Sequence, residues 1–197
     1  ASDIPSDISV AATVQTQIEK WKSIWAQAEK IYAEAESQIP EENWYRASMA
    51  AVRLLNVGNN YWANTKYEEL KYAIATARED GGKLGKIQKL VDRGGADDFL
   101  AAIKQIETIE EGSYFYQKAQ ALIPEIGRKM LDLAQETLDK RDADQAVEIA
   151  NRIPAIANLE TEVQDFVVIA EAHRTAFVGT VSSIEAAIAE AQKVGLD

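Results

Sequence analysis

One short segment of the chain has the residue types that bind phosphate groups. Residues 81–86, GGKLGK, combine glycines with lysines, as do the loops that cradle nucleotide phosphates. Those loops follow the pattern G-x-x-x-x-G-K-[ST] after an apolar strand. Here Ile87 stands where Ser or Thr is needed, and no apolar strand precedes the segment. The pattern therefore predicts a helix that stops at Gly81-Gly82 and restarts at Lys83, and it does not indicate a nucleotide site.

The other residue types that catalyse reactions are isolated or lie near expected helix ends. His173 is the only histidine and lies on an apolar stripe between Ala170 and Phe177. With no cysteine and no second nitrogen ligand, it is expected to be a packed or half-buried side chain. Acidic doublets near helix starts favour the helix macrodipole without any catalytic role. There are four such doublets, mostly in first turns or at helix ends: Glu41-Glu42, Glu68-Glu69, Asp97-Asp98 and Glu110-Glu111. The macrodipole explains Glu41-Glu42 and Asp97-Asp98. We expect no catalytic residue, no metal and no cofactor, although a paired-carboxylate hydrolase stays open.

Aromatic residues give the clearest indication of a binding surface. Nine of the 15 aromatic residues lie between Trp21 and Tyr72. Trp44-Tyr45 and Tyr61-Trp62 are adjacent pairs, and neighbours on a helix cannot both face one core. At least one member of each pair should be partly exposed, and exposed Trp and Tyr are favoured interface anchors. The alternative is packing on two sides of a stacked helical unit. The candidate binding residues are Trp44, Tyr45, Tyr61 and Trp62.

A row of basic residues forms the second candidate binding surface. The chain has a net charge of −11, and residues 142–197 hold ten acidic residues against three basic ones. This balance argues against nucleic-acid binding, which requires a basic surface. The exception to this acidic balance is a ridge of four basic residues, Lys83, Lys86, Lys89 and Arg93. Such a ridge is commonly a solvated face; the alternative is contact with an acidic partner or anionic lipid headgroups.

The whole chain has the composition and periodicity of an all-α protein. Hydrophobic residues make up 47% and charged residues 27%, with only four prolines and ten glycines, which is typical of a folded helical chain. No run of about 18 apolar residues is present, so no membrane span is expected. Apolar spacing and caps predict helices at about 7–38, 41–57, 60–79 and 83–93, then from Asp97 or Ala96 to near Gly112, from Ser113 to Leu138, from Asp142 to Ile153, from Ile156 to 177, and from Thr180 or Ser182 onward.

The first expected helix carries a heptad seam. Its apolar residues alternate at spacings of four and three: Val14, Ile18, Trp21, Trp25, Ala28, Tyr32, Ala35 and Ile39. The seam predicts either an antiparallel partner within the chain or a contact with a helix of another protein.

A long helix, a polar turn and a short alanine-rich helix form a unit that recurs along the chain. The clearest copy is residues 114–154, with Pro124 as an expected kink or first-turn residue and Asp142 as an expected N-cap. Alanine-rich triplets recur at offsets of 51, 44 and 41 residues, at Ala50-Ala51-Val52, Ala101-Ala102-Ile103, Gln145-Ala146-Val147 and Ala186-Ala187-Ile188. These periods predict an α-solenoid of stacked helical hairpins, similar to tetratricopeptide repeats. The expected units are 1–58, 59–112 with an extra helix at 83–93, 113–154 and 155–197, a fragment of a longer array.

Four longer motifs occur along the chain: W-x-x-I-W-x-x-A-E-K-I-Y (21–32), R-L-L-N-V-G-N-N-Y-W-A-N-T-K-Y-x-E-L (53–70), YFYQKAQ (114–120) and I-A-N-R-I-P (149–154). They resemble a cyanobacterial family of membrane-anchored helical-repeat proteins that are often labelled chromosome segregation ATPases. The resemblance implies a repeat array tethered by one membrane span outside this chain, and it supplies no catalytic residues. Ala143, Val147, Ala150 and Pro154 loosely match the second helix of tetratricopeptide repeats.

The sequence thus predicts a non-enzymatic scaffold or adaptor that binds protein partners through an extended helical surface. The expected chain is a soluble domain of a membrane-associated parent protein, in the periplasm or thylakoid lumen in preference to the cytoplasm. The first alternative is a self-associating structural element, with the chain as a homo-oligomer. The second is an enzyme or nucleotide-dependent protein. No nucleic acid is expected among the partners.

Overall fold

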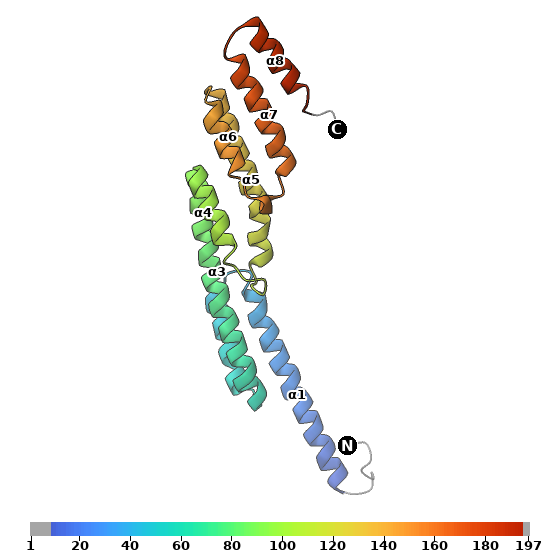
Figure 1. Cartoon of the computed structure of the whole chain (residues 1–197). Coiled ribbons are helices and arrows are strands. Elements are labelled where there is room, and N and C mark those ends of the chain that lie inside the picture. Colours follow the sequence, from blue (N-terminus) through green and yellow to red (C-terminus); the bar gives the residue numbers. More distant parts are fainter. Residues whose placement is uncertain (1–8, 195–197) are drawn as a thin grey trace. The chain divides into compact units, whose positions relative to one another are not determined.

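The structure is a computed structural model that describes residues 9–194. Within that range the chain is helical and has no strand (Figure 1), so the all-α prediction is confirmed. The helices form two compact units that divide between Gly81 and Gly82. The sequence also predicts a cap of the first helix at Ser6 or Asp7, and both residues lie outside the described ones.

Unit 1 is built on a helical hairpin. It contains α1 (Ser9–Gln38), α2 (Trp44–Arg53), the 3-10 helix η1 (Leu54–Asn56), the π-helix η2 (Tyr61–Lys66) and the first part of α3 (Tyr67–Arg93). α1 packs against α2, and η1 packs against η2. Small residues let the two helices of the hairpin approach closely, since Ala28, Ala35, Ala47 and Ala51 are all buried between larger apolar side chains.

The turn between α1 and α2 differs from the expected one. A proline suits the first turn of a helix, so the sequence also predicts that Pro40 begins the helix expected at 41–57. This is wrong because α2 begins at Trp44. Residues 39–42 form a turn, in which Glu42 has a left-handed backbone with φ of 57°. The turn reverses the chain so that α2 lies against the C-terminal half of α1.

Unit 2 contains helices that pack in sequence order. After the second part of α3 it contains α4 (Ala96–Ile106), α5 (Tyr116–Asp139), α6 (Ala143–Asn151), the 3-10 helix η3 (Ala155–Ala157), α7 (Glu160–Ala176) and α8 (Val181–Ala191). α4 packs on α5, α5 on α6, α6 on α7, and α7 on α8. Figure 1 shows α5, α6, α7 and α8 side by side in this order. Each helix therefore buries apolar surface against its neighbour in the sequence.

Two apolar clusters fill unit 2. The first joins α3, α4, α5 and η3 and includes Ile87, Phe99, Ile106 and Met130; the second joins α5, α6 and α7 and includes Leu138 and Phe166. Gly127 is the point of closest approach between α5 and η3. A Cβ atom there would lie 2.7 Å from Leu159 Cδ1 and 2.8 Å from Ala157 Cβ. Only glycine fits this position without a shift of its neighbours.

Long and short helices alternate along the chain as the repeats predict. The four alanine-rich triplets all fall in the short helices α2, α4, α6 and α8, which have 10, 11, 9 and 11 residues. The helices α1, α3, α5 and α7 have 30, 27, 24 and 17 residues. A buried alanine from each triplet explains the recurrence, because a small side chain is needed where the short helix crosses the long one: Ala51, Ala102, Ala146 and Ala187.

The break predicted at Gly81-Gly82 is wrong, because α3 runs through it without interruption. A separate helix at 83–93 therefore does not exist. Gly82 and Gly85 are exposed, and nothing lies within 4 Å of the place a Cβ atom would take at either. A glycine inside a helix costs about 1 kcal/mol relative to alanine. Buried side chains on either side, Ile74 before and Ile87 after, hold the helix by packing, which outweighs this local cost.

Helix caps follow the sequence in most places. The Asp142 carboxylate accepts a hydrogen bond from the Gln145 N–H at 3.0 Å and caps α6, as predicted. Thr180 caps α8 in a capping box with Ser183. The prediction of Ser113 as the cap of α5 is wrong, since that helix begins at Tyr116. Pro124 lies inside α5 and not in its first turn.

Candidate functional site

Four aromatic side chains of unit 1 form a cluster between α1 and η2. The Trp25 and Tyr61 rings are parallel, with centroids 5.7 Å apart, and Trp62 meets Trp25 edge-on at 5.3 Å and Tyr32 at 5.9 Å. Such offset and edge-to-face contacts add about 0.5–1.5 kcal/mol each beyond area burial. We call Trp25, Tyr32, Tyr61 and Trp62 the aromatic cluster.

Lys66 lies near two rings of the aromatic cluster and forms an ion pair with Glu69. Lys66 Nζ lies 5.7 Å from the Tyr32 ring centroid and 5.8 Å from that of Tyr61, and it donates to Glu69 Oε2 at 2.5 Å. The hydrogen bond to Glu69 raises the pKa of Lys66. Burial raises the pKa of the Tyr32 hydroxyl, and the negative charge of Glu36 adds to this effect. The lysine therefore stays protonated and the tyrosine neutral around pH 7.

The π-helix η2 sets the positions of the two adjacent aromatics. Asn59 Oδ1 accepts from the backbone N–H of Tyr61 at 3.0 Å and of Trp62 at 3.3 Å, which fixes the start of the segment. Trp62 is 5% exposed, and its indole Nε1 has no hydrogen-bond partner. Tyr61 is 43% exposed. The prediction that one member of this pair is partly exposed is confirmed, while Trp62 is a core residue and no anchor.

The other aromatic pair lies at the start of a more exposed apolar surface. Trp44 is half-buried and Tyr45 is 75% exposed. One and two turns further on, Met49 and Val52 are also exposed, followed by Leu55 in η1. Their spacing places them on one side of the helix. We call Tyr45, Met49, Val52 and Leu55 the α2 stripe. Of these four residues, only Tyr45 was predicted from the sequence as a binding residue. The i, i+4, i+7 spacing of Tyr45, Met49 and Val52 could have indicated the other exposed residues of α2.

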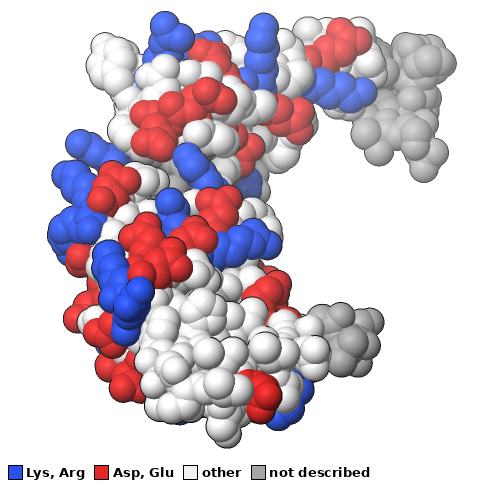
Figure 2. Space-filling view, turned by 90° about the horizontal axis from the view of Figure 1, so that it is seen from above, with Lys and Arg blue, Asp and Glu red and all other residues white. Residues whose placement is uncertain are grey.

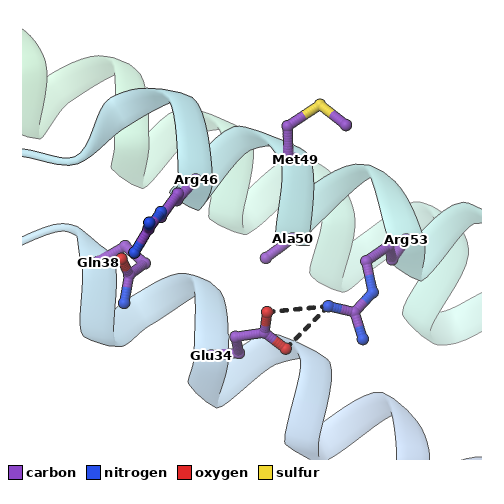
Figure 3. A pocket seen from close by; sticks show the side chains of 6 residues that line it. All are labelled: Glu34, Gln38, Arg46, Met49, Ala50 and Arg53. Carbon is purple, nitrogen blue, oxygen red and sulfur yellow. Dashed lines mark hydrogen bonds and ion pairs between the residues drawn. The ribbon is translucent and has the colours of Figure 1, made fainter.

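The α2 stripe runs between two grooves. The first has a volume of about 440 Å³ and lies between α1 and α2; it is lined by Glu34, Gln38, Arg46, Met49, Ala50 and Arg53 (Figure 3). In it Arg53 Nη1 donates to both Glu34 oxygens, at 2.9 and 2.8 Å, while the Arg46 side chain extends toward Gln38. The second groove, of about 190 Å³, lies between α2 and α3 and includes Val52, Tyr67 and Lys71. Arginine supplies the only charges on α2, at positions 46 and 53.

The predicted basic ridge is not a uniform surface. Lys83 is half-buried, and its Nζ lies 3.5 Å from the Thr108 carbonyl oxygen. Arg93 pairs with Asp98 at the start of α4, and the hydrogen bond from Arg93 lowers the pKa of that carboxyl. Lys86 and Lys89 are exposed. Two of the four residues therefore have partners within unit 2, and contact with anions stays a prediction for the other two.

The residue types considered for catalysis form no constellation in the described part of the chain. His173 was expected to be packed or half-buried, and this is wrong: it is exposed, with its ring edge-on to Phe177 at 6.0 Å. The neighbouring Ala172 takes the buried position. Residues 81–86 are helical and form no loop around a phosphate. Among residues 9–194, no group of His, Cys, Asp and Glu could hold a metal ion, and no helix there is both long and apolar enough to cross a membrane.

A second exposed apolar surface lies in unit 2, where α7 meets α8. Figure 2, viewed toward this end of the unit, shows a broad area without Lys, Arg, Asp or Glu. Exposed apolar residues gather at the turn and along the outer side of α8: Phe177, Val178, Val181, Ile184 and Ile188. We call Val181, Ile184 and Ile188 the α8 stripe.

No family model, no curated protein and no solved structure matches this chain.

Proposed function

We propose that this chain is a non-enzymatic scaffold or adaptor whose α2 stripe binds a helix of a protein partner. The observation that supports this proposal is the exposure of Tyr45, Met49 and Val52 on one side of a single helix, at 75%, 51% and 43%. Isolated exposed apolar residues are ordinary, but a contiguous row beside two grooves is typical of interaction sites.

Shape and charge favour an amphipathic helix with acidic flanks as the partner. The row of exposed side chains on α2 offers the spacing that a partner helix meets with apolar residues at i, i+3, i+4 and i+7. The charged side chains of α2 are Arg46 and Arg53, and Lys71 lines the groove on the other side. Carboxylates on the flanks of the partner would meet these cations, although Arg53 already pairs with Glu34 and Lys71 with Glu68.

The wider architecture in this proposal is an α-solenoid of tetratricopeptide-like hairpins. It is supported by the alternation of long and short helices and by the sequential packing from α4 to α8. Solenoids offer extended surfaces, and proteins that use them bind partners along the array. We also propose that sequence outside this chain tethers the array to a membrane, and only the motif resemblance supports this.

The experiment is selection from a displayed library of helical peptides against the full chain. Enriched peptides should have apolar residues at helical spacing and Asp or Glu on the flanks. Replacing both Tyr45 and Met49 by alanine should weaken binding of these peptides by at least about tenfold, because buried aromatic anchors carry most of the energy of such contacts. The matched control is Tyr72→Ala, which removes a tyrosine 74% exposed on α3, outside both grooves.

Two results would overturn the proposed site. One is a selection that yields no helical binder at all. The other is a set of binders that the doubly substituted chain retains with the same affinity as the unaltered chain, provided that its far-UV circular dichroism is unchanged.

A further inference from the structure

The α8 stripe is an exposed apolar surface that no other described residue of unit 2 covers. α8 packs against α7 through Ala187, which is 7% exposed. Val181, Ile184 and Ile188 stand to one side of that contact and are 75%, 45% and 54% exposed. Their i, i+3, i+7 spacing forms a short stripe along the helix.

A second open stripe lies on the N-terminal half of α1. The buried residues of the heptad seam begin only at Ala28, while Trp21 is 61% exposed and Val14 and Ile18 are partly exposed. The prediction that the whole seam packs within the chain therefore holds only for its C-terminal half. We call Val14, Ile18 and Trp21 the α1 seam.

The repeat itself indicates what covers such a stripe. α6 is a short helix like α8, and it packs both against the long helix before it, α5, and against the long helix after it, α7. All of its inward residues, Ala143, Ala146, Ile149 and Ala150, are buried as a result. In α8 the corresponding second side is the exposed stripe. The occupant that fits it is a long helix with a seam of apolar residues at helical spacing.

We propose that the α8 stripe of one copy of this chain packs against the α1 seam of a second copy. The contact repeats between chains the packing of a short helix on the following long helix that α6 and α7 make within the chain. Because the two surfaces are different, each added copy leaves one α1 seam and one α8 stripe free. Such a head-to-tail contact generates a ring if it closes and a filament if it does not.

Charge favours this pairing over contact between two identical surfaces. Glu185 lies next to the α8 stripe, while Glu190 lies on the other side of the helix and pairs with Lys193. Lys22 lies next to the α1 seam. Two α8 stripes in contact would bring like charges together. The proposal is independent of the α2 stripe, since it uses neither that helix nor its grooves.

The test is sedimentation velocity of the full chain and of two variants, each blocked at one surface. Trp21→Glu blocks the α1 seam, and Val181→Glu with Ile188→Glu blocks the α8 stripe. The unaltered chain should form species larger than a dimer as its concentration rises. Each variant alone should self-associate about 100-fold more weakly or worse, because a carboxylate is placed in an apolar contact. An equimolar mixture of the two variants should form a one-to-one dimer and nothing larger.

The controls place the same glutamate on the opposite sides of the same helices, as Ser23→Glu and Ala186→Glu, both at exposed positions. These variants should assemble like the unaltered chain. If the double variant loses helicity, Val181→Glu alone serves, because a glutamate in the first turn of α8 suits the helix dipole.

Each contrary outcome excludes the proposal. A chain that stays monomeric at millimolar concentration has no such contact. Assembly that persists with Trp21→Glu alone indicates pairing between α8 stripes, and assembly that persists with the α8 variant alone indicates pairing between α1 seams. If the two blocked variants fail to combine when mixed, the surfaces do not recognise each other.

Discussion

Replacing Gly127 by alanine tests the close packing of η3 on α5. The added Cβ would lie 2.7 Å from Leu159 Cδ1 and 2.8 Å from Ala157 Cβ, and both distances are too short for carbon atoms. The Leu159 methyl group can rotate away, but the Cβ of Ala157 moves only with the backbone of η3. Overpacking of this kind costs about 1–3 kcal/mol, against which alanine gains about 1 kcal/mol of helix propensity.

The difference between these two terms is a loss of up to about 2 kcal/mol in the free energy of unfolding of Gly127→Ala. The matched control is Gly85→Ala in α3, at a position with nothing within 4 Å. There only the propensity term acts, so the free energy of unfolding should rise by about 1 kcal/mol. Urea denaturation followed by far-UV circular dichroism measures both, and each kcal/mol corresponds to about 2–4 °C in Tm.

The two substitutions should differ in their effect on the free energy of unfolding: Gly85→Ala should raise it and Gly127→Ala should not. If Gly127→Ala gains as much stability as Gly85→Ala, η3 does not lie on α5 as described. If Gly85→Ala is destabilising, α3 does not have an open helical backbone at Gly85.

Four further substitutions test caps, charges and aromatic roles. Asp142→Ala should cost about 1 kcal/mol of stability in urea denaturation, because it removes the N-cap of α6; an unchanged stability would exclude the cap. Asp98→Asn should lose stability at pH 7. Because Arg93 lowers the pKa of Asp98 below 3.8, the difference from the unaltered chain should vanish as the pH falls below this value, and a difference that persists at pH 2 would contradict the ion pair. Trp62→Ala should cost about 3–5 kcal/mol as a core deletion, whereas Tyr45→Ala should change stability by less than about 0.5 kcal/mol; equal losses would contradict the division between core and surface.

The sequence allowed the helices and most of their caps to be predicted, because these depend on local chemistry. Asp142 and Thr180 cap the helices that follow them, and the alanine-rich triplets mark the short helices. Predictions from local chemistry were wrong where tertiary packing decides the backbone conformation. Gly81-Gly82 is typical of a helix end, yet α3 continues through it because side chains on both sides are buried.

The candidate site was predictable only in part, since periodicity identifies an apolar side of a helix but not whether another element covers it. The α1 seam is one continuous pattern in sequence, but only its second half is buried. Likewise Met49 and Val52 follow the same spacing as core residues and are exposed. The stripe through Ala170 suggested a packed or half-buried His173. However, α7 packs on both α6 and α8, so Ala170 and Ala172 are buried on different sides of the helix and His173 is exposed.

The distribution of tryptophan allows the unfolding of unit 1 to be followed by intrinsic fluorescence. All four tryptophans, Trp21, Trp25, Trp44 and Trp62, precede Gly82 and so belong to unit 1, and two of them form ring contacts in the aromatic cluster. Indole emission therefore follows the melting of unit 1, whereas far-UV circular dichroism sums over every helix. Coincident transitions by the two signals would mean that both units unfold as one cooperative block, and separated transitions would give each unit its own midpoint.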